Sequence, residues 1–256
     1  MYKYFQKLPL TFYTLDNYAS TQVIPNYFVR TKFLPNVVNN SSFYDEYYIT
    51  DGETPEVTSM NFYGDTGLYW IILQANDITD PRFGWPLDQH DLKRFAEGKY
   101  NNINAPHHYE DSGGNVVSAT IVLSTTATNA NSFMGISNNT VITNNTNTGV
   151  GVITSKPNNQ SVTVVTNPGN GGFISGDQIL SVANTSHTGV TLTSISITSG
   201  TAITNLIYED RENETKRNIK VLKRELVSDI VSEFETLIKT WQQYLLNKLA
   251  LLIFKS

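Results

Sequence analysis

Between residues 117 and 198, apolar side chains alternate with hydroxyl side chains in a series of short segments. A period of two places apolar side chains on one face of a strand and hydroxyls on the other. The pattern predicts strands at 117–124, 140–143, 150–154, 161–166, 178–182 and 190–198. Turn-forming clusters, such as Asn-Pro-Gly-Asn-Gly-Gly at 167–172, separate them. Short strands with this spacing and without a fixed repeat indicate an all-β sandwich or small barrel rather than a solenoid.

The same stretch also differs from the rest of the chain in composition. Residues 111–205 hold 56 Ser, Thr, Asn and Gly residues among 95, and only three charged residues. The other residues carry 38 of the 41 charges and 27 of the 29 aromatic side chains. Such different compositions predict separate folding units. We therefore expect an inserted β domain at 111–205, carried by a strand pair formed from residues 107–115 and 201–210.

For the residues before the insert, the sequence predicts extended segments that are followed by a pair of short helices. Residues 1–50 are rich in Tyr and Phe and are repeatedly interrupted by proline, which favours extended segments that need another surface to pack on. Thr54 and Pro55 then form a helix start, and Gly64 ends the apolar run that follows. A second helical run surrounds Trp70, and a third helix is predicted at 91–100.

After the insert, apolar residues recur every three or four positions from Leu226 to the end of the chain. This spacing predicts an amphipathic helix of about eight turns. Its apolar stripe is broad, and a helix of this kind usually packs on partner helices. The predicted partner interface consists of Val227, Ile230, Phe234, Leu237, Trp241 and Leu245. The whole pattern predicts an α+β fold with regions at 1–50, 51–110, 111–205 and 206–256, the last being a strand and the long helix.

Residues with catalytic chemistry are sparse. The chain has no cysteine, which excludes disulfides, thiol catalysis and Cys-ligated zinc. His107 and His108 stand beside acidic residues, but neighbours on a strand point to opposite faces, so we expect no metal site there. The scattered acids Asp51, Glu53, Asp65, Asp77 and Asp80 occupy cap or turn positions, where such residues are common. With no nucleophile, metalloprotease or phosphate-loop motif, the sequence predicts neither an enzyme nor a cofactor.

Charge and hydropathy exclude further classes. The net charge of −5 is unfavourable for nucleic-acid binding. The most apolar stretch, residues 249–254, is far shorter than the roughly 20 residues that a membrane span needs. Lys7 and Pro9 interrupt the apolar character of the N-terminus, so we expect no secretory signal and synthesis in the cytoplasm.

Residues 52–81, GETPEVTSMNFYGDTGLYWIILQANDITDP, resemble a LysM module. The matching positions are Gly52, Thr54, Tyr63-Gly64, Trp70 and Ala75-Asn76. The resemblance implies a small helical unit whose core contains Val57, Tyr63, Gly64, Trp70, Ile71, Ile72, Ala75 and Asn76. The segment after Pro81, FGWPLDQHDLKRF, departs from the ending of glycan-binding LysM modules, which argues against peptidoglycan binding by this unit.

Residues 63–81, together with the FGWPL that follows at 83–87, resemble baseplate wedge proteins of T-even-like contractile-tail phages, of the gene product 53 type. The run NETKRNIKVLKRELVSDIVSEFETLI at 213–238 resembles the ending of the same family. The resemblance covers about 40–110 and 203–240 and leaves out the β region. It implies a structural protein of the virion tail baseplate, made in the host cytoplasm, which joins wedge proteins and contacts neighbouring wedges.

Two other functions stay open at this point. The LysM-like stretch and a β domain could form a peptidoglycan- or surface-glycan-binding module of a tail protein. Glycan sites usually present aromatic platforms, however, and the β region contains only Phe133 and Phe173. A cell-wall hydrolase would need a pair of catalytic carboxylates that the sequence does not offer.

Overall fold

The computed structural model describes residues 4–14, 21–29, 31–33, 35–128, 132–145, 149–167, 169, 172–181 and 188–253. The chain forms two compact units, a first unit of residues 1–89 with 213–256 and a second unit of residues 90–212. Helices and strands are mixed, as the predicted α+β class requires. These unit boundaries do not coincide with the changes in composition at 111 and 205.

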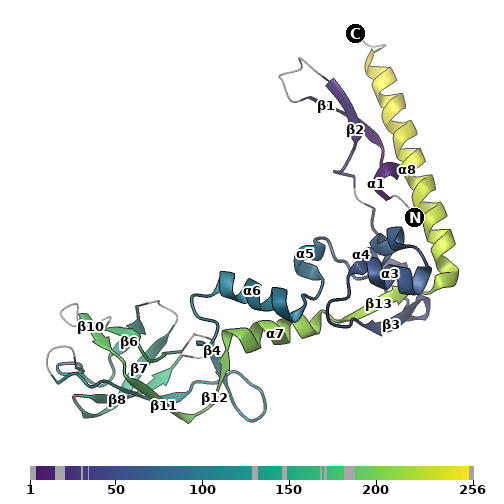
Figure 1. Ribbon diagram of the computed structural model, residues 1–256. Helices are drawn as coiled ribbons and strands as arrows, with labels where there is room; N and C mark the ends of the chain where they lie inside the picture. Colours follow the sequence, from purple (N-terminus) through teal and green to yellow (C-terminus); the bar gives the residue numbers. More distant parts are fainter. Residues whose placement is uncertain are drawn as a thin grey trace. The chain divides into compact units, whose positions relative to one another are not determined.

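The centre of the first unit is a pair of helices packed on a two-stranded sheet (Figure 1). Strand β3 (Tyr44–Tyr48) precedes helices α3 (Pro55–Tyr63) and α4 (Tyr69–Ala75), which are joined by the 3-10 turn η2 (Thr66–Leu68). The second strand, β13 (Asn218–Leu222), comes from far along the chain and pairs antiparallel with β3, with Tyr44 opposite Leu222. The helical unit predicted at 51–110 is therefore completed by strands on both sides of that range.

Local chemistry explains where these helices start and stop. The Thr54 hydroxyl accepts a hydrogen bond from the Val57 N–H at 3.4 Å and caps α3. Gly64 has a φ of 75°, a left-handed conformation that favours glycine, and it ends the helix. The Asp65 carboxylate accepts from the Gly67 N–H at 2.8 Å and starts the next turn. The predicted helix pair is present with this break between its members.

The N-terminal residues are more structured than the prediction of extended segments allowed. They form helix α1 (Tyr4–Lys7), a hairpin of β1 (Leu10–Thr14) and β2 (Thr21–Pro25), helix α2 (Pro35–Val38) and the turn η1 (Ser41–Phe43). The N-terminal segments were expected to pack on another surface. The core of the first unit supplies part of that surface, because Leu8 is buried in it and Tyr4 packs against it.

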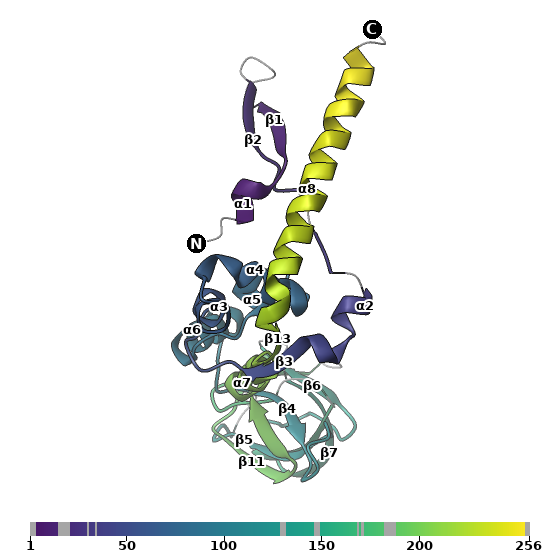
Figure 2. The same ribbon diagram turned by 90° about the vertical axis from the view of Figure 1, so that its right-hand side faces the viewer.

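The first unit ends in the long helix α8 (Arg224–Ile253), close to the predicted helix from residue 226. Figure 2 shows this helix extending beyond α3 and α4. Val227, Phe234 and Ile238 are its buried side chains among those described, and they belong to the core of the unit. The short helix α5 (Pro81–Gly84), capped by Asp80, completes this unit.

In the second unit, helix α6 (Gln89–Lys99) and helix α7 (Asn205–Thr215) accompany the strand pair β4 (Pro106–Glu110) and β12 (Thr201–Thr204). The predicted strand pair is correct for 107–110 and 201–204. The prediction of a strand up to residue 210 is wrong, because the chain is helical from Asn205. Asn205, Glu209 and Asn213 are buried polar residues four positions apart, a helical spacing that was overlooked.

The predicted strands of the insert form one antiparallel sheet with the order β10-β9-β6-β7-β8-β5-β11. The bounds are β5 (Thr120–Ser124), β6 (Val141–Asn144), β7 (Val150–Asn158), β8 (Ser161–Thr166), β9 (Gln178–Ser181), β10 (Thr188–Thr191) and β11 (Ser194–Ser199). The two end strands, β10 and β11, are separated by only two residues. The segment 188–199 thus pairs with β9 through β10 and with β5 through β11.

One face of this sheet is filled with aliphatic side chains. Strand β8 buries Val162, Val164 and Thr166 and leaves the alternate residues partly exposed, as the alternation in sequence predicted. Phe133 and Phe173 are fully buried in the same cluster.

Among the described residues, none of the helices combines the length and the apolar character that crossing a membrane would take.

Candidate interaction surface

The residues predicted from the LysM resemblance all lie on or beside α3 and α4, but not all of them are buried, because Val57 and Gly64 are exposed. Tyr63, Trp70, Ile71, Ile72 and Ala75 are buried in the core of the first unit. Val57, in contrast, is 47% exposed on the outer face of α3, so its assignment to the core was wrong. The reason is helical geometry, because Thr58 and Ser59 occupy the inward positions of α3 and are fully buried.

Asn76 connects the helices to the distant strand. Its side-chain amide donates to the Lys220 carbonyl at 2.8 Å, and its side-chain oxygen accepts from the Lys220 N–H at 2.8 Å. These two bonds extend the pairing of β13 on the side away from β3. Asn76 is therefore a structural residue of this unit.

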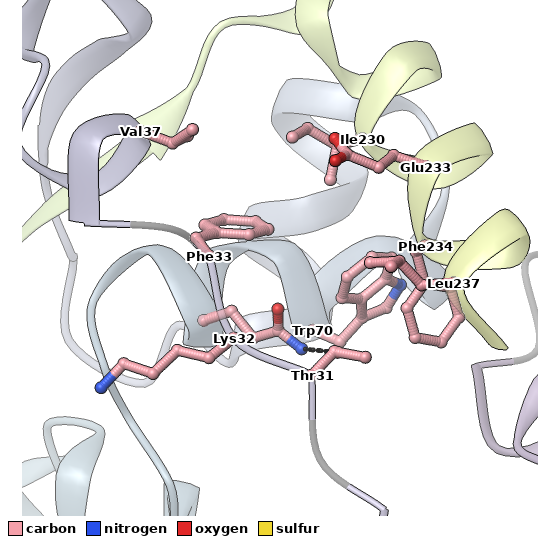
Figure 3. Close-up of a pocket in the computed structure, with 10 residues that line it drawn as sticks. Thr31, Lys32, Phe33, Val37, Trp70, Ile230, Glu233, Phe234 and Leu237 are labelled. Carbon is pink, nitrogen blue, oxygen red and sulfur yellow. Dashed lines mark hydrogen bonds between the residues drawn. The ribbon is translucent and has the colours of Figure 1, made fainter. Parts of the chain in front are cut away.

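Trp70 is the aromatic centre of this core. Its indole is only 4% exposed, and the ring centroids of Phe234 and Tyr4 lie 4.9 and 5.1 Å away. Figure 3 shows Trp70 beside Phe234 at the edge of a hollow of about 200 Å³, which is lined by residues of α8 and by residues 31–33 and Val37. Phe33, from the N-terminal part of the chain, also lines this hollow (Figure 3).

The apolar stripe predicted on the last helix divides into two parts. Val227 and Phe234 are buried in their own chain and Ile230 is half-buried, so these three residues are not a free interface. Leu237 and Trp241 are 50% and 51% exposed. The side chain of Leu245 lies outside the described residues.

The exposed apolar surface of α8 extends along the helix to Tyr244 and across to Phe28 in the N-terminal segment of the first unit. Tyr244, one turn beyond Trp241, is 55% exposed and lies 6.2 Å from it between ring centroids. A second hollow of about 490 Å³ is lined by Leu237, Trp241 and Phe28, and Phe28 is 94% exposed. We call the four residues Phe28, Leu237, Trp241 and Tyr244 the distal patch. Sequence reasoning missed Phe28 and Tyr244, although Tyr244 follows Leu237 at heptad spacing.

An ion pair fixes the segment that precedes this patch. Lys7 lies 2.9 Å from Glu235 on α8, and the rings of Tyr4 and Phe234 are stacked at 5.1 Å. Helix α1 is thus attached to α8 in the turns before Leu237, whereas the distal patch lies beyond this attachment.

The acidic residues that could suggest catalysis have structural roles. Asp65 and Asp80 cap helical turns, and Asp51 pairs with the buried Arg217 at 2.9 Å. Glu53 is buried, and its carboxylate accepts from the hydroxyls of Tyr47, Thr50 and Thr58 at 2.8–2.9 Å. Burial alone raises the pKa of Glu53, but these hydrogen bonds outweigh it, so that the net pKa is lowered.

The two adjacent histidines do not point apart as the strand geometry predicted. Their Nδ1 atoms lie 2.9 Å from each other, so the reason given for excluding shared ligation was wrong. Within the residues that the structure describes, no group of three or more His, Asp or Glu side chains is arranged to hold a metal ion.

Comparison with known proteins yields one family and one curated relative. Residues 1–124 match the family described as "Base plate wedge protein 53". Baseplate wedge protein gp53 of Enterobacteria phage T4 is 33% identical over 70 residues, which is 26% of this chain and 36% of that protein. The family match ends within β5, so the resemblance noted at 203–240 lies outside it and stays a prediction, as does the LysM-like character of the helical unit.

Proposed function

We propose that this protein joins wedge proteins to one another in a contractile tail, because its residues 1–124 match the family described as "Base plate wedge protein 53". The family supports a structural role in the virion tail baseplate. The joining of other wedge proteins is our proposal, and it rests on the surface of α8. The match spans 36% of the T4 relative, so partners are argued from this chain's own residues.

The observation that carries the proposal is that the apolar stripe of α8 continues past the core that covers it. Phe234 and Ile238 are buried, but Trp241 and Tyr244, on the following turns, are half exposed. Contiguous apolar surface of this kind normally marks an interaction site. Tryptophan and tyrosine are also the residues that most often dominate binding energy at protein interfaces.

Glycan binding, the alternative, finds no support in the three aromatic residues of the LysM-like stretch and the β region on which that hypothesis rested, Trp70, Phe133 and Phe173. Trp70 is buried against Tyr4 and Phe234 and offers no flat face for a sugar ring. Phe133 and Phe173 are buried inside the β sheet. The aromatic residues that the glycan hypothesis would have used are therefore occupied by packing.

The experiment is co-expression of the full chain with the individual baseplate proteins of the same phage, followed by affinity capture. Trp241→Ser together with Tyr244→Ser should lower the capture of the partner at least about tenfold, since hot-spot residues are worth about 2 kcal/mol or more each. The matched control is Lys239→Ser with Gln243→Ser on exposed positions of the same helix turns. Equal capture by both double variants would contradict the proposal.

A further inference from the structure

Four side chains of the second unit form a continuous chain of polar contacts. Arg211 of α7 lies 2.7 and 2.9 Å from the two carboxylate oxygens of Glu110. Glu110 lies 2.9 Å from Nε2 of His108, and Nδ1 of His108 lies 2.9 Å from Nδ1 of His107. This series of polar contacts ends at the His107 ring, which stacks on the ring of Tyr208 of α7 with 3.8 Å between the ring centroids.

The donor and acceptor chemistry of these contacts assigns the protons. The Arg211 guanidinium, together with His108, lowers the pKa of Glu110, whose carboxylate is therefore an acceptor. Nε2 of His108 must then donate to it. In a neutral His108 ring Nδ1 is an acceptor, so Nδ1 of His107 carries the hydrogen that lies between the two rings.

This contact tolerates only one hydrogen between the two Nδ1 atoms. One additional proton still allows a donor to face an acceptor: on Nε2 of His107 it leaves the contact unchanged, and on Nδ1 of His108 it requires the hydrogen of His107 to move to Nε2. A second additional proton places N–H groups on both sides of a 2.9 Å gap, and two positive rings then repel each other. The contact must therefore break when both histidines are charged.

Other ionisable groups surround the pair without removing this conflict. On α7, Glu209 accepts hydrogen bonds from Lys99 at 2.7 Å and from Tyr100 at 2.6 Å, both at the end of α6. On β4, Glu110 is held by Arg211. The paired strand β12 contributes Ile203 opposite His108 and no ionisable residue. Each neighbouring carboxylate thus already has a cationic partner.

We propose that His107 and His108 form a pH-sensitive catch that holds strand β4 against helix α7 and opens when both rings are protonated. The catch consists of the shared hydrogen between the Nδ1 atoms and of the stack on Tyr208. It is independent of the proposed function, because it lies wholly within the second unit and uses no residue of α8.

The sign of the effect follows from the pKa of His107. Burial, followed by the charge of His108, lowers this pKa below the ordinary value of 6.5. The unfolded chain therefore binds protons more readily than the folded chain in this range. The stabilisation is complete above pH 6.5 and is lost as the pH falls through the lowered pKa.

Nitrogen NMR of the histidine rings in the full-length protein tests the catch directly. At pH 8 we expect different tautomers, with hydrogen on Nδ1 of His107 and on Nε2 of His108. On acidification to pH 4.5, amide exchange in β4 and β12, corrected for the intrinsic rate, should rise at least about tenfold, the factor that one pKa unit represents. Identical tautomers in the two rings, or unchanged exchange, would overturn the proposal.

Two variants separate the catch from general acid sensitivity. His107→Phe keeps a ring for stacking on Tyr208 but removes the second charge, so the rise in exchange should be abolished. His90→Gln, at an exposed position of α6, is the control and should retain it. A full acid response in His107→Phe would show that the pair is not the cause, and the tautomers of the unaltered protein decide the question if that variant does not fold.

Discussion

Glu53 shows how single residues stabilise the first unit. It is a buried carboxylate held by neutral donors: the Tyr47, Thr50 and Thr58 hydroxyls and the Thr50 N–H. Its backbone carbonyl also accepts from the Trp85 indole N–H at 2.7 Å. One turn residue thus connects β3, α3 and the segment after α5.

The prediction for Glu53→Gln is a loss of about 1–3 kcal/mol in the free energy of unfolding at pH 7, because an amide NH₂ would face hydrogen-bond donors. Urea denaturation measures this value. Because the pKa of Glu53 lies below its usual value of 4.5, its contribution is present above that pH and is lost as the pH falls further. The variant should therefore lose less stability than the natural chain between about pH 5 and pH 3. An identical pH dependence in the two proteins would contradict this account.

Truncating Trp70 tests the aromatic core. Trp70→Ala removes a buried indole packed between Tyr4 and Phe234 and should cost about 3–5 kcal/mol in the free energy of unfolding. Phe28→Ala, at a side chain that is 94% exposed, should change it by less than about 0.5 kcal/mol. Similar losses in the two variants would mean that Trp70 is not part of the core.

At the scale of single residues, the sequence predicted the burial of apolar side chains better than the burial of polar ones. The run around Trp70 predicted burial because its apolar residues are too many to leave in water. Val57 could not be placed, since α3 turns Thr58 and Ser59 inward, where Glu53 and the Asp65 carbonyl accept from their hydroxyls. The burial of hydroxyl residues in place of an apolar residue depends on hydrogen-bond acceptors that only the folded chain brings near them.

At the scale of elements, local pattern succeeded where apolar and hydroxyl residues alternate without charged residues between them. The strands of the insert were predicted from alternation alone, although only three of their six pairings among the described residues join strands that are neighbours in sequence. Strand β13 was missed, although Ile219 and Val221 alternate with Asn218 and Lys220, because charged residues on both sides masked the pattern. Its partner β3 lies about 170 residues earlier, which no local window contains.

Helix α8 allows stability and binding to be separated. Deleting residues 241–256 removes Trp241 and Tyr244 but keeps Val227, Phe234 and Ile238, the buried anchors of the helix. We expect the midpoint of thermal unfolding to change by no more than about 4 °C, which corresponds to about 1 kcal/mol for a chain of this size. Partner capture should be lost. Global unfolding after this deletion, detected by circular dichroism, would show that the distal turns belong to the core.

At the scale of the whole molecule, composition located the insert but not the edges of the compact units. Tyr109 of β4 is fully buried in the core of the β sheet, together with Ala119. Cutting the chain at 111 and 205, as the change in composition suggests, would uncover this ring. The second unit begins at His90 and ends at Glu212 instead, so α6 and most of α7 belong with the strands.

Excision of the second unit tests this division. The Asn213 side chain accepts from the Leu87 N–H at 2.8 Å and donates to the Leu87 carbonyl at 2.9 Å, so the two ends of the first unit are already bound together. Joining Gln89 to Asn213 through a short Gly-Ser linker should give a protein that unfolds cooperatively, because the closure entropy of a short loop is small. Aggregation or non-cooperative unfolding of the joined chain would refute the division.

The central claim, that the distal patch of α8 contacts another baseplate protein, is tested most directly by photo-crosslinking in assembled tails. A photoreactive phenylalanine derivative takes the place of Trp241, with the exposed Lys239 position as the matched control. We predict a cross-link from position 241 to a different baseplate protein and a much weaker one from position 239. Cross-links from position 241 only within its own chain, or equal yields from the two positions, would contradict the claim.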